Sequence, residues 1–146
     1  MLIFLIALIC LIMFIQDNKY RGISWYLFPA LFVSALFYST NYTFNILIGN
    51  ILIFSIILAF MTLYLSLKFK KIVLITNNYF SIGDVLFLIA VAPFFTHLFY
   101  VIFINVGTLL TLLIYFLFQK KQHQKNIPFA GNMALVLIVL IILFHE

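Results

Sequence analysis

Acidic residues and cysteines are scarce in this sequence. Of its 146 residues three are Asp or Glu and one is a cysteine, and only 8% are charged. Because Cys10 is the only thiol, the sequence excludes a disulfide framework, a CxxC redox pair and a multi-cysteine metal site. Cys10 lies inside an apolar run, so we expect it to be a buried packing residue.

Long hydrophobic runs, in contrast, fill most of the chain. Hydrophobic residues make up 67% of the sequence and the mean hydropathy is +1.29, which is outside the range of soluble domains. The apolar runs cover residues 1–15, 24–39, 44–67, 85–95, 98–118 and 129–144. Since a spanning helix needs about 20 apolar residues, we predict an all-α polytopic membrane protein with about six transmembrane helices. Residues 1–146 form a single transmembrane domain in this interpretation.

Two boundaries in this pattern need a decision. The run at residues 1–15 has no basic segment before it and no small-x-small cleavage site after it, so we interpret it as the first span and not as a signal peptide. The long apolar stretch after Asp84 must be divided, and we place the break near Thr96 and His97, which follow Pro93. A break at residues 105–107 is the alternative.

The basic residues predict the orientation. Lys and Arg occur only between the first and second, the third and fourth, and the fifth and sixth segments; they are Lys19, Arg21, Lys68, Lys70, Lys71, Lys120, Lys121 and Lys125. With six spans these connections share one side of the membrane, which the Lys and Arg bias identifies as cytoplasmic. We therefore expect a multi-pass protein of the bacterial inner membrane, in contact with the lipid bilayer, with both termini outside the cytoplasm. The net charge of +5 reports this orientation and predicts no nucleic-acid partner.

Only two acidic residues lie inside the chain, Asp17 and Asp84, because the third acid, Glu146, is the last residue. Asp17 follows the first predicted span and Asp84 precedes the fourth, so both belong at the cytoplasmic boundary, where they can meet. Each has a structural interpretation: Asp17 as a solvated loop residue beside cations, and Asp84 as a helix N-cap. As a pair near hydrocarbon they indicate a functional site.

Two neighbouring carboxylates can hydrolyse a peptide bond. They share one proton and titrate as a unit. The ionised carboxylate takes a proton from water while the protonated carboxyl polarises the scissile carbonyl, as in aspartic proteases. This chemistry requires no cofactor and no metal. His97, His123 and His145 fall on different sides of the predicted topology, so they predict no common metal site.

The chain contains, in this order, DNKYRGI at residues 17–23, SIGDV at 81–85 and IPFA at 127–130. Together these segments resemble the motifs of the type IV prepilin peptidase (leader peptidase) family of GxGD-type aspartic membrane proteases. The segment DNKYRGI at residues 17–23, which ends at Ile23, resembles the family's first motif. SIGDV at residues 81–85 resembles the GxGD motif, with Ser81 in place of its first glycine, and IPFA at residues 127–130, which contains Pro128, resembles the Ile-Pro-Phe-Gly segment before the last span. Ser24 and Leu86 stand where a proline and a lysine are common in the family.

The resemblance implies a function. The chain resembles the small stand-alone members of the family, such as the preflagellin and tight-adherence pilus peptidases. This resemblance implies that Asp17 and Asp84 are the catalytic residues and that Gly83 is a position of close backbone approach. The implied substrate is a prepilin-like precursor whose short basic leader is cleaved at the cytoplasmic membrane face, with a pilus or secretion assembly as a further partner. No methyltransferase activity is expected. We also expect Lys19 and Arg21 to lower the pKa of Asp17.

Two other classes of function compete with this prediction. In a non-catalytic relative or a small membrane assembly subunit, the two aspartates would make structural contacts only. In a carrier or proton-linked transporter, they would be proton sites.

Overall fold

The computed structural model describes residues 2–39, 44–70, 81–119 and 128–143. Throughout these ranges the regular structure is helical, without a strand, so the predicted all-α class is confirmed. The elements are α1 (Leu2–Tyr20), α2 (Leu27–Tyr38), α3 (Phe44–Phe69), α5 (Ile82–Val91), the 3-10 turn η1 (Ala92–Phe94), α6 (His97–Ile114), the π-helical turn η2 (Tyr115–Gln119) and α7 (Phe129–Leu143).

Each of the six apolar segments of the sequence forms a helix, but the helices differ in length. Three of them, α1, α3 and the helix from His97 to Leu117, are long and apolar enough to cross a membrane. The other three, α2, α5 with η1, and α7, have between 10 and 17 residues, fewer than the roughly 20 that a perpendicular span requires. The structure therefore contains three candidate spans, and the count of six stays a prediction.

The break between the fourth and fifth segments lies where the sequence places it. Helix α5 ends at Val91, the turn η1 contains Pro93, and α6 begins at His97. The ring of Pro93 cannot continue the hydrogen-bond ladder of a preceding helix, which accounts for the change to a 3-10 turn. The alternative break at residues 105–107 is wrong, because these residues lie inside α6.

The first helix is longer than predicted. The sequence assigns Asp17, Lys19 and their neighbours to a loop, whereas α1 continues to Tyr20. The prediction was wrong because polar side chains do not end a helix by themselves, and Lys19 in the last turn faces the negative end of the helix dipole. Helix α1 ends where Arg21 adopts the left-handed conformation, with φ of 56°, and donates its N–H to the carbonyl of Asp17 at 3.1 Å.

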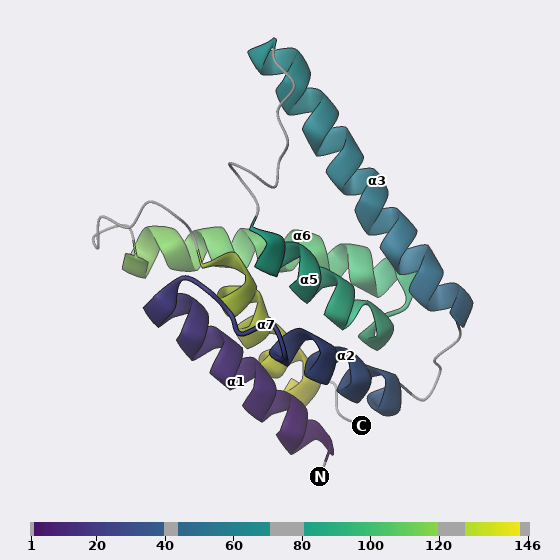
Figure 1. Ribbon diagram of the computed structural model, residues 1–146, viewed down its shortest axis with the longest axis vertical. Coiled ribbons are helices and arrows are strands. Elements are labelled where there is room, and N and C mark those ends of the chain that lie inside the picture. The colour runs from purple at the N-terminus through teal and green to yellow at the C-terminus, as the bar shows by residue number, and fades with distance from the viewer. Residues whose placement is uncertain (1, 40–43, 71–80, 120–127, 144–146) are drawn as a thin grey trace.

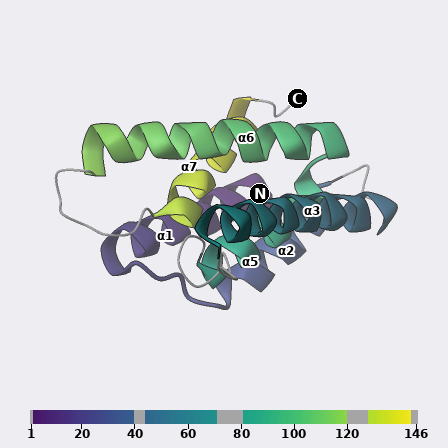
Figure 2. The same cartoon turned by 90° about the horizontal axis from the view of Figure 1, so that it is seen from above.

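Helix α7 is the centre of the bundle. It makes its most extensive contact with α1 and also packs against α6 and α5, and it lies between α6 and α1 when seen from above (Figure 2). The fully buried Met133 and Leu137 of α7 join the core that also includes Ile6, Met13 and Phe87. Helix α3 contacts mainly α6 and η1, and its C-terminal half extends away from the other helices (Figure 1).

Buried hydrogen bonds join the start of α3 to the turn between α5 and α6. The side chain of Asn50 donates to the carbonyls of Ala92 and Phe95 at 2.9 and 2.7 Å, and its Oδ1 lies 2.9 Å from Nδ1 of His97. The ring of Tyr38, at the end of α2, packs against Phe94 at 5.6 Å between centroids. The end of α2, the start of α3 and the turn after α5 therefore meet at one end of the bundle.

Candidate active site

Asp17 lies on the buried stripe of α1 that faces α7. Ile6, Cys10, Met13 and Asp17 are buried on this helix, and their spacing of three and four residues places them on one face. The burial of Cys10 confirms its predicted packing role. Asp17 is only 9% exposed, and its Oδ2 accepts a hydrogen bond from the backbone N–H of Gly131 at 2.7 Å.

Asp84 lies in the first turn of α5 and is 7% exposed. Ser81 is the N-cap: its Oγ accepts from the N–H of Asp84 at 3.2 Å, and its own N–H donates to Oδ2 of Asp84 at 2.9 Å. This reciprocal pair is a capping box. The sequence-based interpretation of Asp84 as the N-cap was wrong. The N-cap is Ser81, three residues earlier, because a serine side chain can accept a hydrogen bond from an orphan N–H as well as an aspartate can.

The start of α7 brings the two aspartates together. Helix N-termini have backbone N–H groups without intrahelical partners, and in α7 two of these groups donate to carboxylates from other helices. The N–H of Ala130 donates to Oδ1 of Asp84 at 3.0 Å, and the next N–H, of Gly131, donates to Asp17. The N–H of Asn132 then closes the first turn by donating to the carbonyl of Pro128 at 3.2 Å.

Donation from consecutive amides limits the separation of the carboxylates. Consecutive backbone nitrogens are less than about 4 Å apart, so the two bonded oxygens of Asp17 and Asp84 lie within about 10 Å of each other. The positive end of the α7 dipole, together with the two N–H donors, stabilises negative charge at this point. The charges of the two aspartates also act on each other directly.

Gly131 allows α1 to approach α7 closely enough for this contact. A Cβ atom at Gly131 would lie 2.7 Å from Cβ of Asp17 and 3.0 Å from its Oδ2. Such distances are well below a normal contact between carbon atoms of about 3.5–4.0 Å. Any side chain at position 131 therefore displaces Asp17 from its N–H donor.

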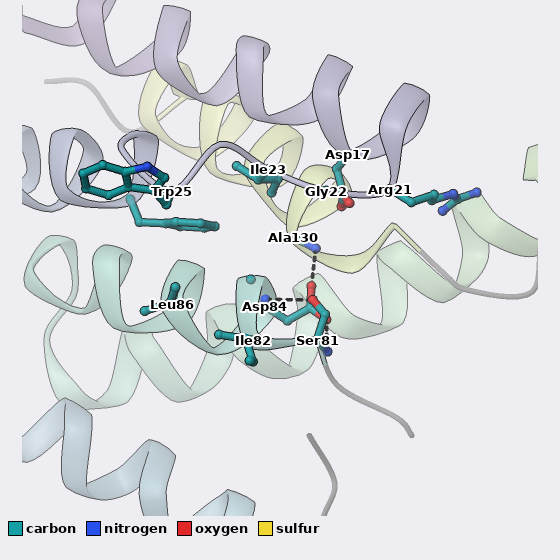
Figure 3. A pocket seen from close by; sticks show the side chains of 12 residues that line it. Asp17, Arg21, Gly22, Ile23, Trp25, Ser81, Ile82, Asp84, Leu86 and Ala130 are labelled. Carbon is teal, nitrogen blue, oxygen red and sulfur yellow. Dashed lines mark hydrogen bonds between the residues drawn. The ribbon is translucent and has the colours of Figure 1, made fainter. Parts of the chain in front are cut away.

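A pocket of about 260 Å³ opens beside the two aspartates. The carboxylates lie on either side of the start of α7, and the side chains of Ile82, Leu86 and Trp25 line the same pocket (Figure 3). The residues that line it are Asp17, Arg21, Gly22, Ile23, Trp25, Phe28, Ser81, Ile82, Gly83, Asp84, Leu86 and Ala130. They come from the end of α1, the following turn and the starts of α2, α5 and α7, so the pocket combines two carboxylates with an apolar wall.

The structure brings most of the other predicted site residues to the same place. Ile23 and Gly83 line the pocket, and Pro128 is buried directly before α7. A Cβ at Gly83 would make only ordinary contacts, at 3.5 Å or more, so the position that requires a glycine here is Gly131. Ile127, which precedes Pro128 in the third motif, lies outside the described residues.

The two basic residues after Asp17 are placed differently from each other. Lys19 is exposed, with Nζ 5.1 Å from the ring centroid of Tyr20. Arg21 lines the pocket and acts electrostatically on Asp17, but its side chain is directed away from both carboxylates (Figure 3). Neither cation forms an ion pair with Asp17 or Asp84 in the described structure. The predicted effect of Lys19 and Arg21 on Asp17 stays a prediction.

No metal centre is formed by the part of the chain that the structure describes, since no three His, Cys, Asp or Glu side chains come together there. Of the three histidines, only His97 is among the described residues, and it contacts Asn50 at the opposite end of α5 from Asp84. His123 and His145 lie outside these residues.

The roles of three residues of the site were not predicted from the sequence. Ala130 and Gly131 act through their backbone N–H groups, and only the order of the motif, IPFA followed directly by a glycine, could have indicated them. Ser81 counted as a departure from the family pattern, whereas it caps the helix that carries Asp84. A serine three residues before an acid at the start of an apolar run is the sequence signal of a capping box.

Comparison of the chain with protein-family models, with curated proteins and with solved structures finds no match. A function for this protein is therefore inferred from the geometry of the site and the chemistry of its residues.

Proposed function

We propose that this protein is an integral membrane aspartic endopeptidase in which Asp17 and Asp84 form the catalytic dyad. One observation carries the proposal. The only two acidic residues inside the chain are 67 positions apart in sequence, yet both are buried beside one pocket, where their carboxylates accept hydrogen bonds from consecutive backbone N–H groups of α7. Buried carboxylates without a cationic partner are costly. A catalytic role explains why this chain contains two of them at one place.

The arrangement of the helix ends supports a six-span topology. The bonds from α7 to Asp17 and Asp84 join the end of α1 to the starts of α5 and α7. In sequence these ends adjoin the three connections that carry the basic residues, while Asn50 of α3 and Tyr38 of α2 contact the turn after α5 at the other end. In the proposed topology the dyad would lie at the cytoplasmic face of a bacterial inner membrane, and the short helices α2, α5 and α7 would cross a locally thinned bilayer.

The dyad can act by general acid–base catalysis. Oδ1 of Asp17 has no hydrogen-bond partner among the described protein groups, so it can contact a water molecule in the pocket. The ionised carboxylate removes a proton from this water, whose oxygen attacks the scissile carbonyl carbon. The protonated carboxyl gives its proton to the carbonyl oxygen. The tetrahedral intermediate then collapses: the leaving amine takes the proton that the first carboxylate removed from water, and the second carboxylate takes a hydroxyl proton of the intermediate as the carbonyl re-forms, which restores the dyad with one proton.

The substrate class comes from the resemblance and from the pocket wall. Ile23, Phe28, Ile82 and Leu86 give the pocket an apolar side next to the carboxylates, which suits a peptide with a nonpolar segment at the cleavage site. We assign as substrate a prepilin-like precursor with a short basic leader, cleaved at the cytoplasmic membrane face. A pilus or secretion assembly is the partner that would receive the product.

A second candidate function is structural. Every hydrogen bond that the carboxylates of Asp17 and Asp84 accept from described residues comes from a backbone N–H group at the start of α5 or α7. The two aspartates thus cap these helices, and capping of this kind stabilises a protein by about 0.5–2 kcal/mol at each site. This observation favours a non-catalytic relative or a small membrane assembly subunit as the alternative.

N-terminal peptide profiling of membranes separates the two functions. In cells that carry Asp84→Asn or Asp17→Asn, we expect N-termini of uncleaved precursor to accumulate, because an amide cannot act as an acid or a base. Ser55→Ala, on the exposed face of α3, is the control and should process normally. If both Asn variants leave all N-termini unchanged but lower the thermal unfolding midpoint, the aspartates are helix caps and the peptidase proposal is wrong.

A further inference from the structure

Asn132 is a fully buried amide without a partner. It has 0% relative exposure, and neither its Oδ1 nor its Nδ2 has a hydrogen-bonding partner among the described protein groups. Leaving a buried polar group unpaired costs about 1–3 kcal/mol. Unpaired groups in folded proteins therefore indicate either a bound water molecule or a functional role.

A second fully buried asparagine among the described residues, Asn50, has hydrogen-bonding partners. Asn50 is also 0% exposed, but its side chain makes three hydrogen bonds, to the carbonyls of Ala92 and Phe95 and to His97. The contrast shows that burial of an amide in this fold does not by itself leave it unpaired. Asn132 differs in its location, directly after the two amides that hold Asp84 and Asp17.

A second unpaired polar group lies on the helix that packs against this part of α7. Thr111 is 1% exposed and its Oγ1 has no partner in the described structure, whereas Oγ1 of Thr108 donates to the carbonyl of Ile104 at 2.6 Å. Thr111 is one turn beyond Gly107 on the buried face of α6, and Gly107 packs directly against Met133, the neighbour of Asn132. Thr111 is therefore one turn from the point where α6 packs against the residue that follows Asn132 in α7.

From these observations we infer that Asn132 and Thr111 hold a buried water molecule that bridges α6 to the first turn of α7. Asn132 offers both a donor and an acceptor and Thr111 a hydroxyl, and a buried water typically makes about three hydrogen bonds. The bridge fixes the turn whose N–H groups bind the two aspartates. Asn132 is in this sense a positioning residue of the dyad, a role that rests on the proposed peptidase function.

The bridge can be tested without a substrate by infrared spectroscopy of the carboxyl groups in vesicles of the full chain. The chain has two internal acids, so Asp17→Asn and Asp84→Asn assign the carboxyl bands directly. We expect Asn132→Leu and Thr111→Val each to shift a dyad band. If both hold the same water, the double variant shifts the band no further than Asn132→Leu alone. Unchanged bands in both single variants, or additive shifts in the double variant, overturn the inference.

Stability and kinetics distinguish a positioning role from a packing role. Asn50→Leu removes three hydrogen bonds and is the matched control, so its thermal midpoint should fall more than that of Asn132→Leu. With a cleavable precursor, we expect Asn132→Leu to lower kcat at least about tenfold, since small displacements of catalytic groups have effects of this size, with KM changed less than about twofold. Asn132→Ser, which can still bind water, should recover part of kcat.

The two proposals fail in different ways. If the wild type cleaves no precursor but the carboxyl bands shift as expected, the water bridge stands and the peptidase function does not. If the wild type cleaves its precursor and Asn132→Leu retains the full kcat, the positioning role of Asn132 is wrong and the peptidase function stands.

Discussion

Among the described residues, the carboxylates of Asp17 and Asp84 bind backbone groups and no charged side chain. Asp84 uses both carboxylate oxygens, one for Ser81 and one for Ala130, whereas Asp17 uses only Oδ2. This asymmetry leaves one oxygen of Asp17 open to the pocket. The two residues are therefore not equivalent in the proposed reaction, although the sequence alone presents them as a matched pair.

Gly131 gives a prediction at the scale of a single residue. Gly131→Ala places a Cβ 2.7 Å from Cβ of Asp17, so the helices must separate. We expect a loss of about 1–3 kcal/mol in unfolding free energy together with loss of cleavage. Gly22→Ala is the control for stability, because a Cβ there meets nothing within 4 Å. Equal thermal midpoints for the two variants would contradict the close packing of α1 on α7.

Among the secondary-structure elements, the N-terminal ends of α5 and α7 supply most of the hydrogen bonds of the site. Helix α5 is capped locally by Ser81, whereas α7 has Pro128 before its first turn and receives its capping groups from α1 and α5. Since the orphan N–H groups of a helix need partners, packing of α1 and α5 against α7 supplies carboxylates for two of them. Capping of α7 and assembly of the dyad are therefore the same event.

The capping box of α5 predicts the effect of changing Ser81. Ser81→Ala removes the hydroxyl that accepts from the N–H of Asp84, so we expect the unfolding free energy to fall by about 1 kcal/mol, and Ser81→Gly to cost only a few tenths. Thermal unfolding in detergent, with the exposed Ser55→Ala of α3 as the control, measures the difference. A Ser81→Ala variant as stable as Ser55→Ala would show that this cap contributes nothing.

At the scale of the whole molecule, the hydrogen bonds separate the connections into two groups. The ends of α1, α5 and α7 that carry the two aspartates meet at one end of the bundle, and the start of α3 meets the turn at Phe95 at the other. The long helix α3 contacts the bundle mainly through its N-terminal half, where Leu47, Asn50 and Phe54 are buried. In the proposed topology its remaining apolar surface faces lipid.

This separation predicts labelling from opposite sides of the membrane. In a Cys10→Ala background, Thr96→Cys should react with a membrane-impermeant maleimide from the outer side of the inner membrane. Gly22→Cys and Lys70→Cys, also at exposed positions, should react only after the cytoplasmic face is opened. Reaction of all three from one side would contradict the six-span topology.

The helical class, the six apolar segments, the break at Thr96 and the two aspartates could all be predicted from the sequence. These features are local: hydrophobic runs form helices, Pro93 interrupts one, and two internal acids in 146 residues are conspicuous. The packed structure was needed to show that Asp17 lies inside α1, that Ser81 caps α5, and that the N–H groups of Ala130 and Gly131 bind the two aspartates. Backbone N–H groups carry no side-chain signature, and their partners are 46 and 114 residues away. Such contacts form only when the packed core brings the helix ends together.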